Sequence, residues 1–167
     1  MNKLLAVLVI CITSFINVQS LKAQDGPPKA MPGLQINRSE LLKIFKEVNI
    51  DSLFFESKDV NGSTCYYNSD QTYTKVVIIG EETNLRLAKI TYKFSTDTAV
   101  NRKSINKMAA FAYIFGKNAG MEWFATRFGE IRIGVPYTSL KSFDFNRQMK
   151  FEYLIDKKSV SLTVIPW

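Results

Sequence analysis

Residues 98–128 read TAVNRKSINKMAAFAYIFGKNAGMEWFATRF, and this stretch decides the fold because its first part carries the pattern of an amphipathic helix. Apolar residues recur at steps of three and four, and charged residues occupy the other side. Asp97 is placed to cap the start of the helix and Gly116 to follow its end. Because 108–115 is apolar almost all round, we expect this helix to lie against a sheet. The apolar positions are Ile105, Met108, Ala109, Phe111, Ala112 and Phe115.

The chain before this helix predicts one shorter helix and four strands. Leu41, Ile44, Phe45 and Val48 follow the helical template after a cap at Asn37 or Ser39. Asn61 and Gly62 separate two runs of strand-forming residues, which is a strong hairpin signal. The predicted strands cover 53–60, 63–68, 72–79 and 85–94, with a bulge near Leu87.

The chain after this helix predicts a second short helix and three further strands. Residues 118–129 fit a short helix, with a strand as the alternative, and 130–135 alternate as a strand that stops before Pro136. Residues 137–146 have no regular pattern, whereas 149–153 and 160–164 alternate around a turn at 156–157. The order predicts an α+β fold, with an antiparallel sheet of about seven strands packed on a central helix and an N-terminal helix.

The N-terminal residues have the pattern of an export signal. Lys3 precedes an apolar run at 4–16, which is shorter than the roughly 20 residues of a spanning helix. We predict a signal peptide at 1–23 that is cleaved after Ala23 or after Ser20, a flexible linker at 24–36 and a single domain at 37–167. An uncleaved anchor is the alternative. Cleavage predicts an exported chain, periplasmic or secreted, with no transmembrane segment in its mature form.

The composition bears on which chemistry to expect. The chain has no histidine, and Cys65 is the one cysteine outside the predicted signal, so triads that need His and the usual zinc, copper and haem ligand sets are missing. We find no phosphate-binding or nucleophile-elbow motif. No cofactor, metal site or catalytic residue is therefore predicted, although an enzyme that uses carboxylates stays open.

The net charge of +7 is carried by the second half of the chain and favours acidic partners. We expect an acidic protein or an anionic envelope polymer, not nucleic acid, and association that slows as salt rises. The main hypothesis is a binding or interaction module, such as an inhibitor or a subunit of an envelope complex. The alternatives are a carrier of a small apolar ligand between sheet and helix, or the carboxylate enzyme. The candidate partner-binding residues are Tyr66, Tyr67, Tyr73, Arg102, Lys103, Lys107, Lys150, Lys157 and Lys158.

These candidates also have simpler readings. Tyrosines in strands commonly pack across to a neighbouring strand, and scattered lysines commonly form a solvated surface. The lysines carry a function only if the group on the central helix and the group on the final hairpin converge on one face.

Overall fold

The computed structural model describes residues 33–50, 54–58, 62–68, 73–144 and 146–167. The predicted signal peptide and residues 24–32 of the predicted linker lie outside them. Seven antiparallel strands form one sheet in the order β1-β2-β3-β4-β7-β6-β5, so the predicted α+β fold is confirmed. The elements are α2 (Arg38–Glu47), β1 (Phe54–Lys58), β2 (Thr64–Asn68), β3 (Thr74–Glu81), β4 (Asn84–Lys93), α3 (Thr98–Gly129), β5 (Tyr137–Phe143), β6 (Arg147–Leu154) and β7 (Ser159–Pro166).

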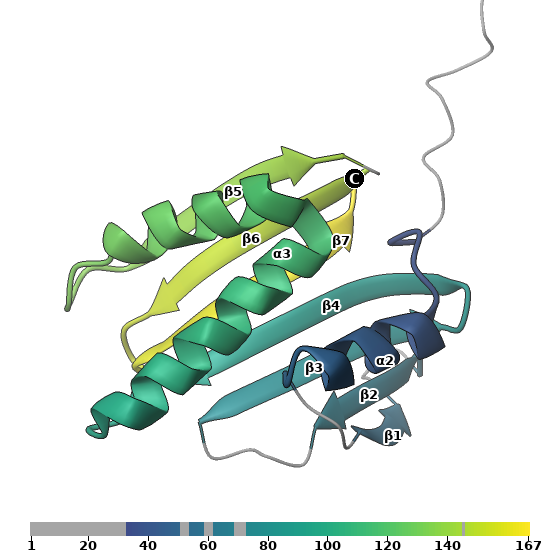
Figure 1. The fold of residues 1–167 in the computed structure, drawn as a ribbon, viewed down its shortest axis with the longest axis horizontal. Coiled ribbons are helices and arrows are strands. Elements are labelled where there is room, and N and C mark those ends of the chain that lie inside the picture. Colours follow the sequence, from purple (N-terminus) through teal and green to yellow (C-terminus); the bar gives the residue numbers. More distant parts are fainter. Residues whose placement is uncertain (1–32, 51–53, 59–61, 69–72, 145) are drawn as a thin grey trace, which may run out of the picture. The chain divides into compact units, whose positions relative to one another are not determined.

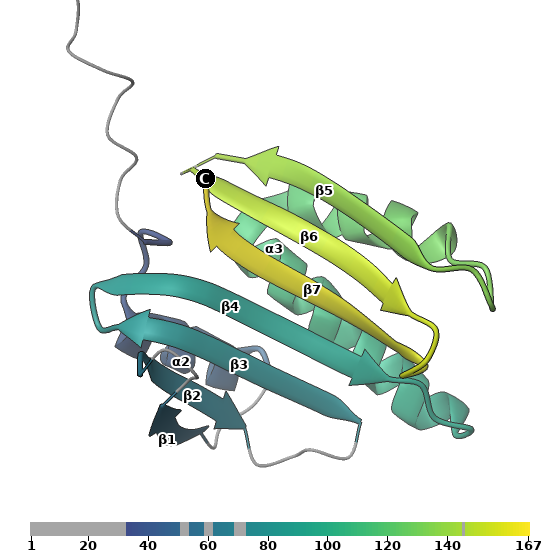
Figure 2. The same ribbon diagram turned by 180° about the vertical axis from the view of Figure 1, so that it is seen from behind.

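Both helices lie on the same face of the sheet. Figure 1 shows α2 in front of the strands of the first half of the chain and α3 in front of β4 to β7. Seen from behind, the other face of the sheet carries neither helix (Figure 2). The sheet therefore has one covered face, which holds the core, and one face that the described helices leave open.

Helix α3 is the central helix that the sequence predicts. The Asp97 carboxylate caps it by accepting hydrogen bonds from the backbone N–H groups of Ala99 (2.7 Å) and Val100 (3.4 Å). The fully buried ring of Phe111 lies 5.7 Å from Phe45 of α2 and 4.9 Å from Phe115. These aromatic contacts hold both helices against the same core.

The predicted break at Gly116 and the second short helix after it are confirmed, because α3 consists of two helical segments that meet at a sharp kink. Lys117 leaves the helical conformation, with φ 52° and ψ −148°, and the chain then continues as helix to Gly129. Residues 118–129 are thus helical, and the strand alternative for them is wrong. Figure 1 shows the second segment turning back at the kink and running over β5 and β6.

The first four strands overlap their predicted ranges within the described residues, whereas Asn61 of the predicted hairpin turn lies outside those residues. β1 pairs with β2 and β3 pairs with β4, each antiparallel. The register shifts where Ile79 faces Leu87 and Gly80 faces Leu85, which leaves Arg86 as the extra residue. The bulge that the out-of-phase leucines predicted near Leu87 is confirmed.

The strand predicted at 130–135 is wrong, and a strand instead covers Tyr137–Phe143. Ile133 is 96% exposed, Val135 is also exposed and Gly134 has a φ of 83°, so this segment is a turn in which only Ile131 packs against the core. Residues 137–143 become a strand because each of them pairs with β6, from Tyr137 opposite Tyr153 to Phe143 opposite Arg147. Long-range pairing, which the local pattern does not contain, decides this segment.

Helix α2 is attached to the sheet by its apolar face and by its first turn. Leu41 and Phe45 are fully buried, and the Ser39 side chain donates a 2.6 Å hydrogen bond to Glu82 in the β3–β4 turn. Leu34, which the sequence assigns to the linker, is also fully buried, and its N–H donates to the Leu85 carbonyl at 2.7 Å. The folded part of the chain therefore includes residues ahead of the predicted boundary at 37.

Candidate functional site

The sheet face opposite the helices, here called the open face, is the first candidate surface. One row of paired residues crosses all seven strands on this face. Because neighbouring residues of a strand point to opposite faces, the partners of this row share one side of the sheet. The row reads Phe55, Tyr67, Val77, Lys89, Thr163, Lys150 and Leu140 from β1 to β5.

The open face is positively charged. Its strand positions carry four lysines and a single glutamate, whose carboxylate lies 2.7 Å from the Lys150 ammonium. Lys89 of the central strand β4 and Lys150 of β6 flank Thr163 of β7, so two cations lie near the middle of the sheet. Such an arrangement attracts an acidic surface. The lysines are Lys75, Lys89, Lys93 and Lys150, and the glutamate is Glu152.

One end of the row is aromatic. Phe55 of the edge strand β1 is 49% exposed, and its ring lies 5.8 Å from that of Tyr67. The Lys75 ammonium lies 6.0 Å from the centre of the Tyr67 ring, within the range of a cation–π contact. Exposed aromatic rings are enriched in protein interfaces.

The structure separates the three candidate tyrosines. Tyr66 lies on the helix side, where its hydroxyl donates to Glu56 at 3.0 Å and the Arg38 guanidinium lies 4.4 Å from its ring. Desolvation and, next, the hydrogen bond to Glu56 raise the pKa of Tyr66. Tyr67 lies on the open face, and Tyr73 precedes β3, where its carbonyl accepts the Lys93 N–H at 2.7 Å. They do not form one aromatic surface, since strand neighbours alternate between faces.

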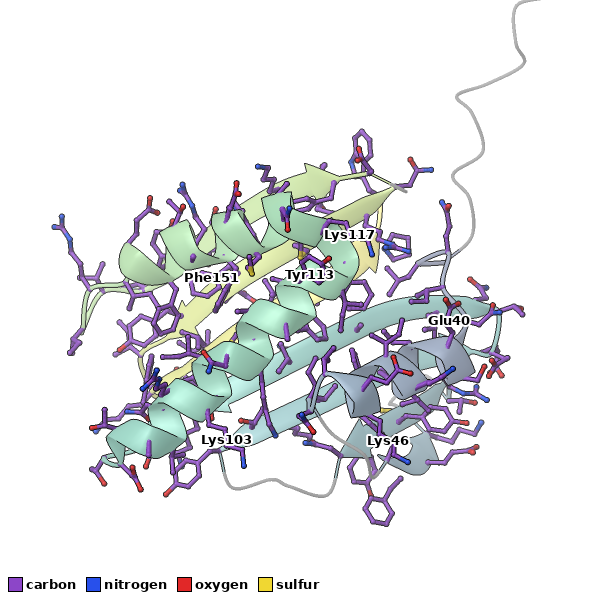
Figure 3. The ribbon with its side chains drawn as sticks, in the orientation of Figure 1. Glu40, Lys46, Lys103, Tyr113, Lys117 and Phe151 are labelled. Atoms are coloured by element: carbon purple, nitrogen blue, oxygen red, sulfur yellow. The ribbon has the colours of Figure 1, made fainter. Side chains whose placement is uncertain are left out.

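The candidate basic residues do not converge on one face either. Arg102, Lys103 and Lys107 lie on α3, on the covered side of the sheet, and Figure 3 shows Lys103 there. Lys150 lies on the open face, so it cannot share a surface with them. The condition that the two groups converge on one face is not met, because alternation along β6 points Lys150 away from the helices.

The other two basic residues lie in the β6–β7 turn. Lys157 and Lys158 are exposed there, and the Lys158 carbonyl accepts the Phe94 N–H at 2.9 Å. This bond places the turn beside Lys93, at the end of β4. The open-face lysines of β3 and β4 were not among the candidates, although the alternation of Lys89 and Lys93 with Ile90 and Tyr92 marks them as outward-facing.

Two surface clefts on the helix side form a second candidate site. The first, the kink cleft, has a volume of about 380 Å³ and lies between the α3 kink and the β5–β6 hairpin. The second, the interhelix cleft, has a volume of about 350 Å³ and lies between α2 and α3. Lys117 and Arg147 line both clefts. The interhelix cleft is lined by Gln35, Ile36, Glu40, Ile44, Val48, Tyr113, Ile114, Lys117 and Arg147.

Arg147 is a fixed cation between the two clefts. Its side chain is buried, and its Nε donates to the Leu34 carbonyl at 2.8 Å, while a terminal nitrogen donates to the Gln35 carbonyl at 3.3 Å. The guanidinium also lies 5.8 Å from the centre of the Phe115 ring. Desolvation lowers the pKa of Arg147, but an arginine stays charged at neutral pH. Its main visible role is to tie residues 34 and 35 to β6.

Lys117 has an unusual backbone for its residue type. A φ of 52° with a ψ of −148° borders the region that is essentially restricted to glycine, and such strain costs about 1–3 kcal/mol. Its ammonium is 5.8 Å from the centre of the Tyr113 ring, and Tyr113 is itself 46% exposed. Figure 3 shows both residues on α3 at the kink. The strained residue is therefore an exposed cation, and it lies where the two clefts meet.

The carrier alternative predicts a pocket between the sheet and the central helix. Large buried side chains fill this interface, including Phe111 and Phe124 of α3 with Tyr92 and Phe151 of the sheet. The two clefts open on the surface beside the helices instead. A ligand of this chain would thus bind against the helices and not beneath them.

Comparisons with family models, curated proteins and solved structures find no match for this chain. In the part of the chain that the structure describes, no three acidic or cysteine side chains gather closely enough to hold a metal ion. None of the helices in those residues has the length and apolarity to span a membrane. The two surfaces themselves are therefore the basis for a proposed function.

Proposed function

We propose that the chain is an exported binding module that docks an acidic protein on its open sheet face. The observation that carries this proposal is the row across all seven strands, which joins the Phe55–Tyr67 ring pair to Lys89 and Lys150. Exposed aromatic rings supply contact area, and the lysines supply attraction to negative charge. Export is predicted from residues 1–23, which resemble a signal peptide.

A protein partner fits this face better than a simple anionic polymer. A polymer needs only cations, whereas the row also presents Phe55, Val77 and Leu140 in register with them. Aromatic and apolar side chains supply contact area to a protein surface that a purely charged polymer would not use. The anionic envelope polymer is the competing outcome of the test below.

The test compares two double variants that are matched in net charge. Lys89→Glu with Lys150→Glu reverses the cations of the open face, and Lys103→Glu with Lys107→Glu reverses the same number on α3. Binding to poly-L-glutamate, an acidic polypeptide probe, is measured by titration calorimetry near 0.15 M salt. We expect the first pair to weaken binding at least about tenfold because two attractive contacts become repulsive. The second pair should change it little.

Three results would count against the proposal. Equal losses in the two double variants would mean that binding follows net charge alone. A larger loss in the α3 variant would place the site on the helix side, where sequence reasoning also placed candidate lysines. Tighter binding of dextran sulfate than of poly-L-glutamate, with no effect of Tyr67→Ala, would favour an anionic polymer over a protein.

A further inference from the structure

The interhelix cleft combines apolar walls with one exposed cation. Val48, which directly follows α2, and Tyr113 of α3 are 40% and 46% exposed, so both present side-chain surface to the cleft and to solvent. Ile44 lies one helical turn before Val48, and Lys117 lies one turn after Tyr113, so each helix contributes a ridge along the cleft. The cleft therefore offers an apolar surface that ends at an ammonium group.

The size of the cleft indicates the size of its ligand. Its volume of about 350 Å³ is at the lower end of the 300–1,000 Å³ that small-molecule sites occupy. A docked helix would need far more room, because a helix with its side chains is about 10–12 Å across. A single short chain fits the space between the ridges.

The charges indicate the head group of the ligand. Lys117 is the exposed cation of the cleft, and Arg147 adds a buried positive charge beside it. Glu40 on the opposite wall reduces the net positive charge. A singly charged anion therefore suits the cleft better than a doubly charged phosphate.

The backbone of Lys117 points to the same conclusion independently. Glycine would adopt its conformation without strain, yet this position carries a long cationic side chain. The ammonium lies over the Tyr113 ring, 5.8 Å from its centre, at the end of the apolar walls. Strained residues cluster at functional sites, so a strained residue that lines a cleft is a reason to look for function there.

We propose that the interhelix cleft binds a medium-chain carboxylate, with the alkyl chain between Val48 and Tyr113 and the carboxylate on the Lys117 ammonium. This site lies on the covered side of the sheet and is separate from the proposed docking of an acidic protein on the open face. It gives the chain a second ligand of a different class. Each surface can fail its test without affecting the other.

The test uses decanoate as the probe and titration calorimetry on the chain lacking residues 1–23, with decanol and acetate as matched ligands. Decanol keeps the chain without the charge, and acetate keeps the charge without the chain. We expect decanoate to bind measurably more tightly than either. Backbone amide signals of residues near Ile44 and Tyr113 should shift on titration.

The decisive variant is Lys117→Gly, because it removes the cation and relieves the backbone strain together. We expect a melting temperature equal to or above that of the parent chain, with a Kd for decanoate that rises about fivefold through the lost ion pair. Lys103→Ala is the control, since it removes an exposed lysine of α3 outside both clefts. Val48→Glu, which places a negative charge on the apolar wall, should also weaken decanoate binding.

Several results would overturn the proposal. These are no decanoate binding at millimolar concentration, equal binding of decanoate and decanol, or an unchanged Kd in both Lys117→Gly and Val48→Glu. The Lys89→Glu and Lys150→Glu double variant should bind decanoate like the parent chain. A loss of decanoate binding in that variant would place the carboxylate on the open face and would contradict the interhelix site.

Discussion

The close contact across the α3 kink predicts that Gly120→Ala destabilises the fold. A Cβ atom at Gly120 would lie 2.5 Å from the backbone carbonyl oxygen of Ala112 and 2.9 Å from the end of the Met149 side chain. The methionine can move aside, but the carbonyl belongs to the first segment of α3 and cannot. The added methyl group would therefore push the two segments of the helix apart.

The expected magnitude follows from two opposing effects. Overpacking costs about 1–3 kcal/mol, and a rigid backbone neighbour places this site near the upper value. Alanine returns about 1 kcal/mol through its better helix propensity. We expect a net loss of about 2 kcal/mol in the free energy of unfolding, which these two principles together give.

The assay is urea unfolding followed by circular dichroism, with Gly129→Ala as the control. Gly129 is the last residue of the same helix, and no atom lies within 4 Å of a Cβ built there. Gly129→Ala should leave the free energy of unfolding unchanged or raise it slightly. The slope of that free energy against urea concentration should stay the same. If Gly120→Ala is as stable as Gly129→Ala, the two segments of α3 do not meet as described and the kink geometry is refuted.

Two further predictions concern the core and the attachment of α2. Phe111→Ala should lower the free energy of unfolding by about 3–5 kcal/mol because a fully buried ring is removed, whereas Phe55→Ala on the open face should cost far less; urea unfolding measures both. Hydrogen bonds from the Ser39 side chain and N–H, and then the Arg38 charge, lower the pKa of Glu82 below its ordinary 4.5. The ionised Glu82 therefore stabilises the fold at neutral pH, and this stabilisation is lost as the pH falls below 4.5 and through the lowered pKa. A carboxyl titration by NMR should show the pKa rising in Ser39→Ala, and an unchanged pKa would contradict the described contacts.

Much of the fold could be predicted from the sequence because most of its elements carry a periodic pattern. Alternation marks β6 and β7 as well as β4, and the Asp97 cap marks the start of α3. β5 could not be predicted in the same way. Its residues are mostly exposed at the sheet edge, so their pattern reports little burial, and they become a strand through pairing with β6.

The candidate surfaces were harder to predict from the sequence than the fold, for two physical reasons. Tyr66 and Tyr67 are neighbours in the sequence, but strand alternation places them on opposite faces of the sheet. The lysines of α3 and Lys150 of β6 likewise lie on opposite sides of the sheet. The row of the open face joins Phe55 to Lys150 across residues distant in the chain, so strand order and register have to be known first. Neither is contained in a local pattern.

The kink shows how local chemistry and global packing together produce a site. A glycine at 116 predicts the end of the first helix, and α3 consists of two helical segments that meet at a kink there. The residue with the strained backbone at this kink is Lys117 and not a glycine. A glycine at 117 would satisfy the fold alone at lower cost. The lysine therefore needs an explanation beyond folding, and a negatively charged ligand at the interhelix cleft supplies one.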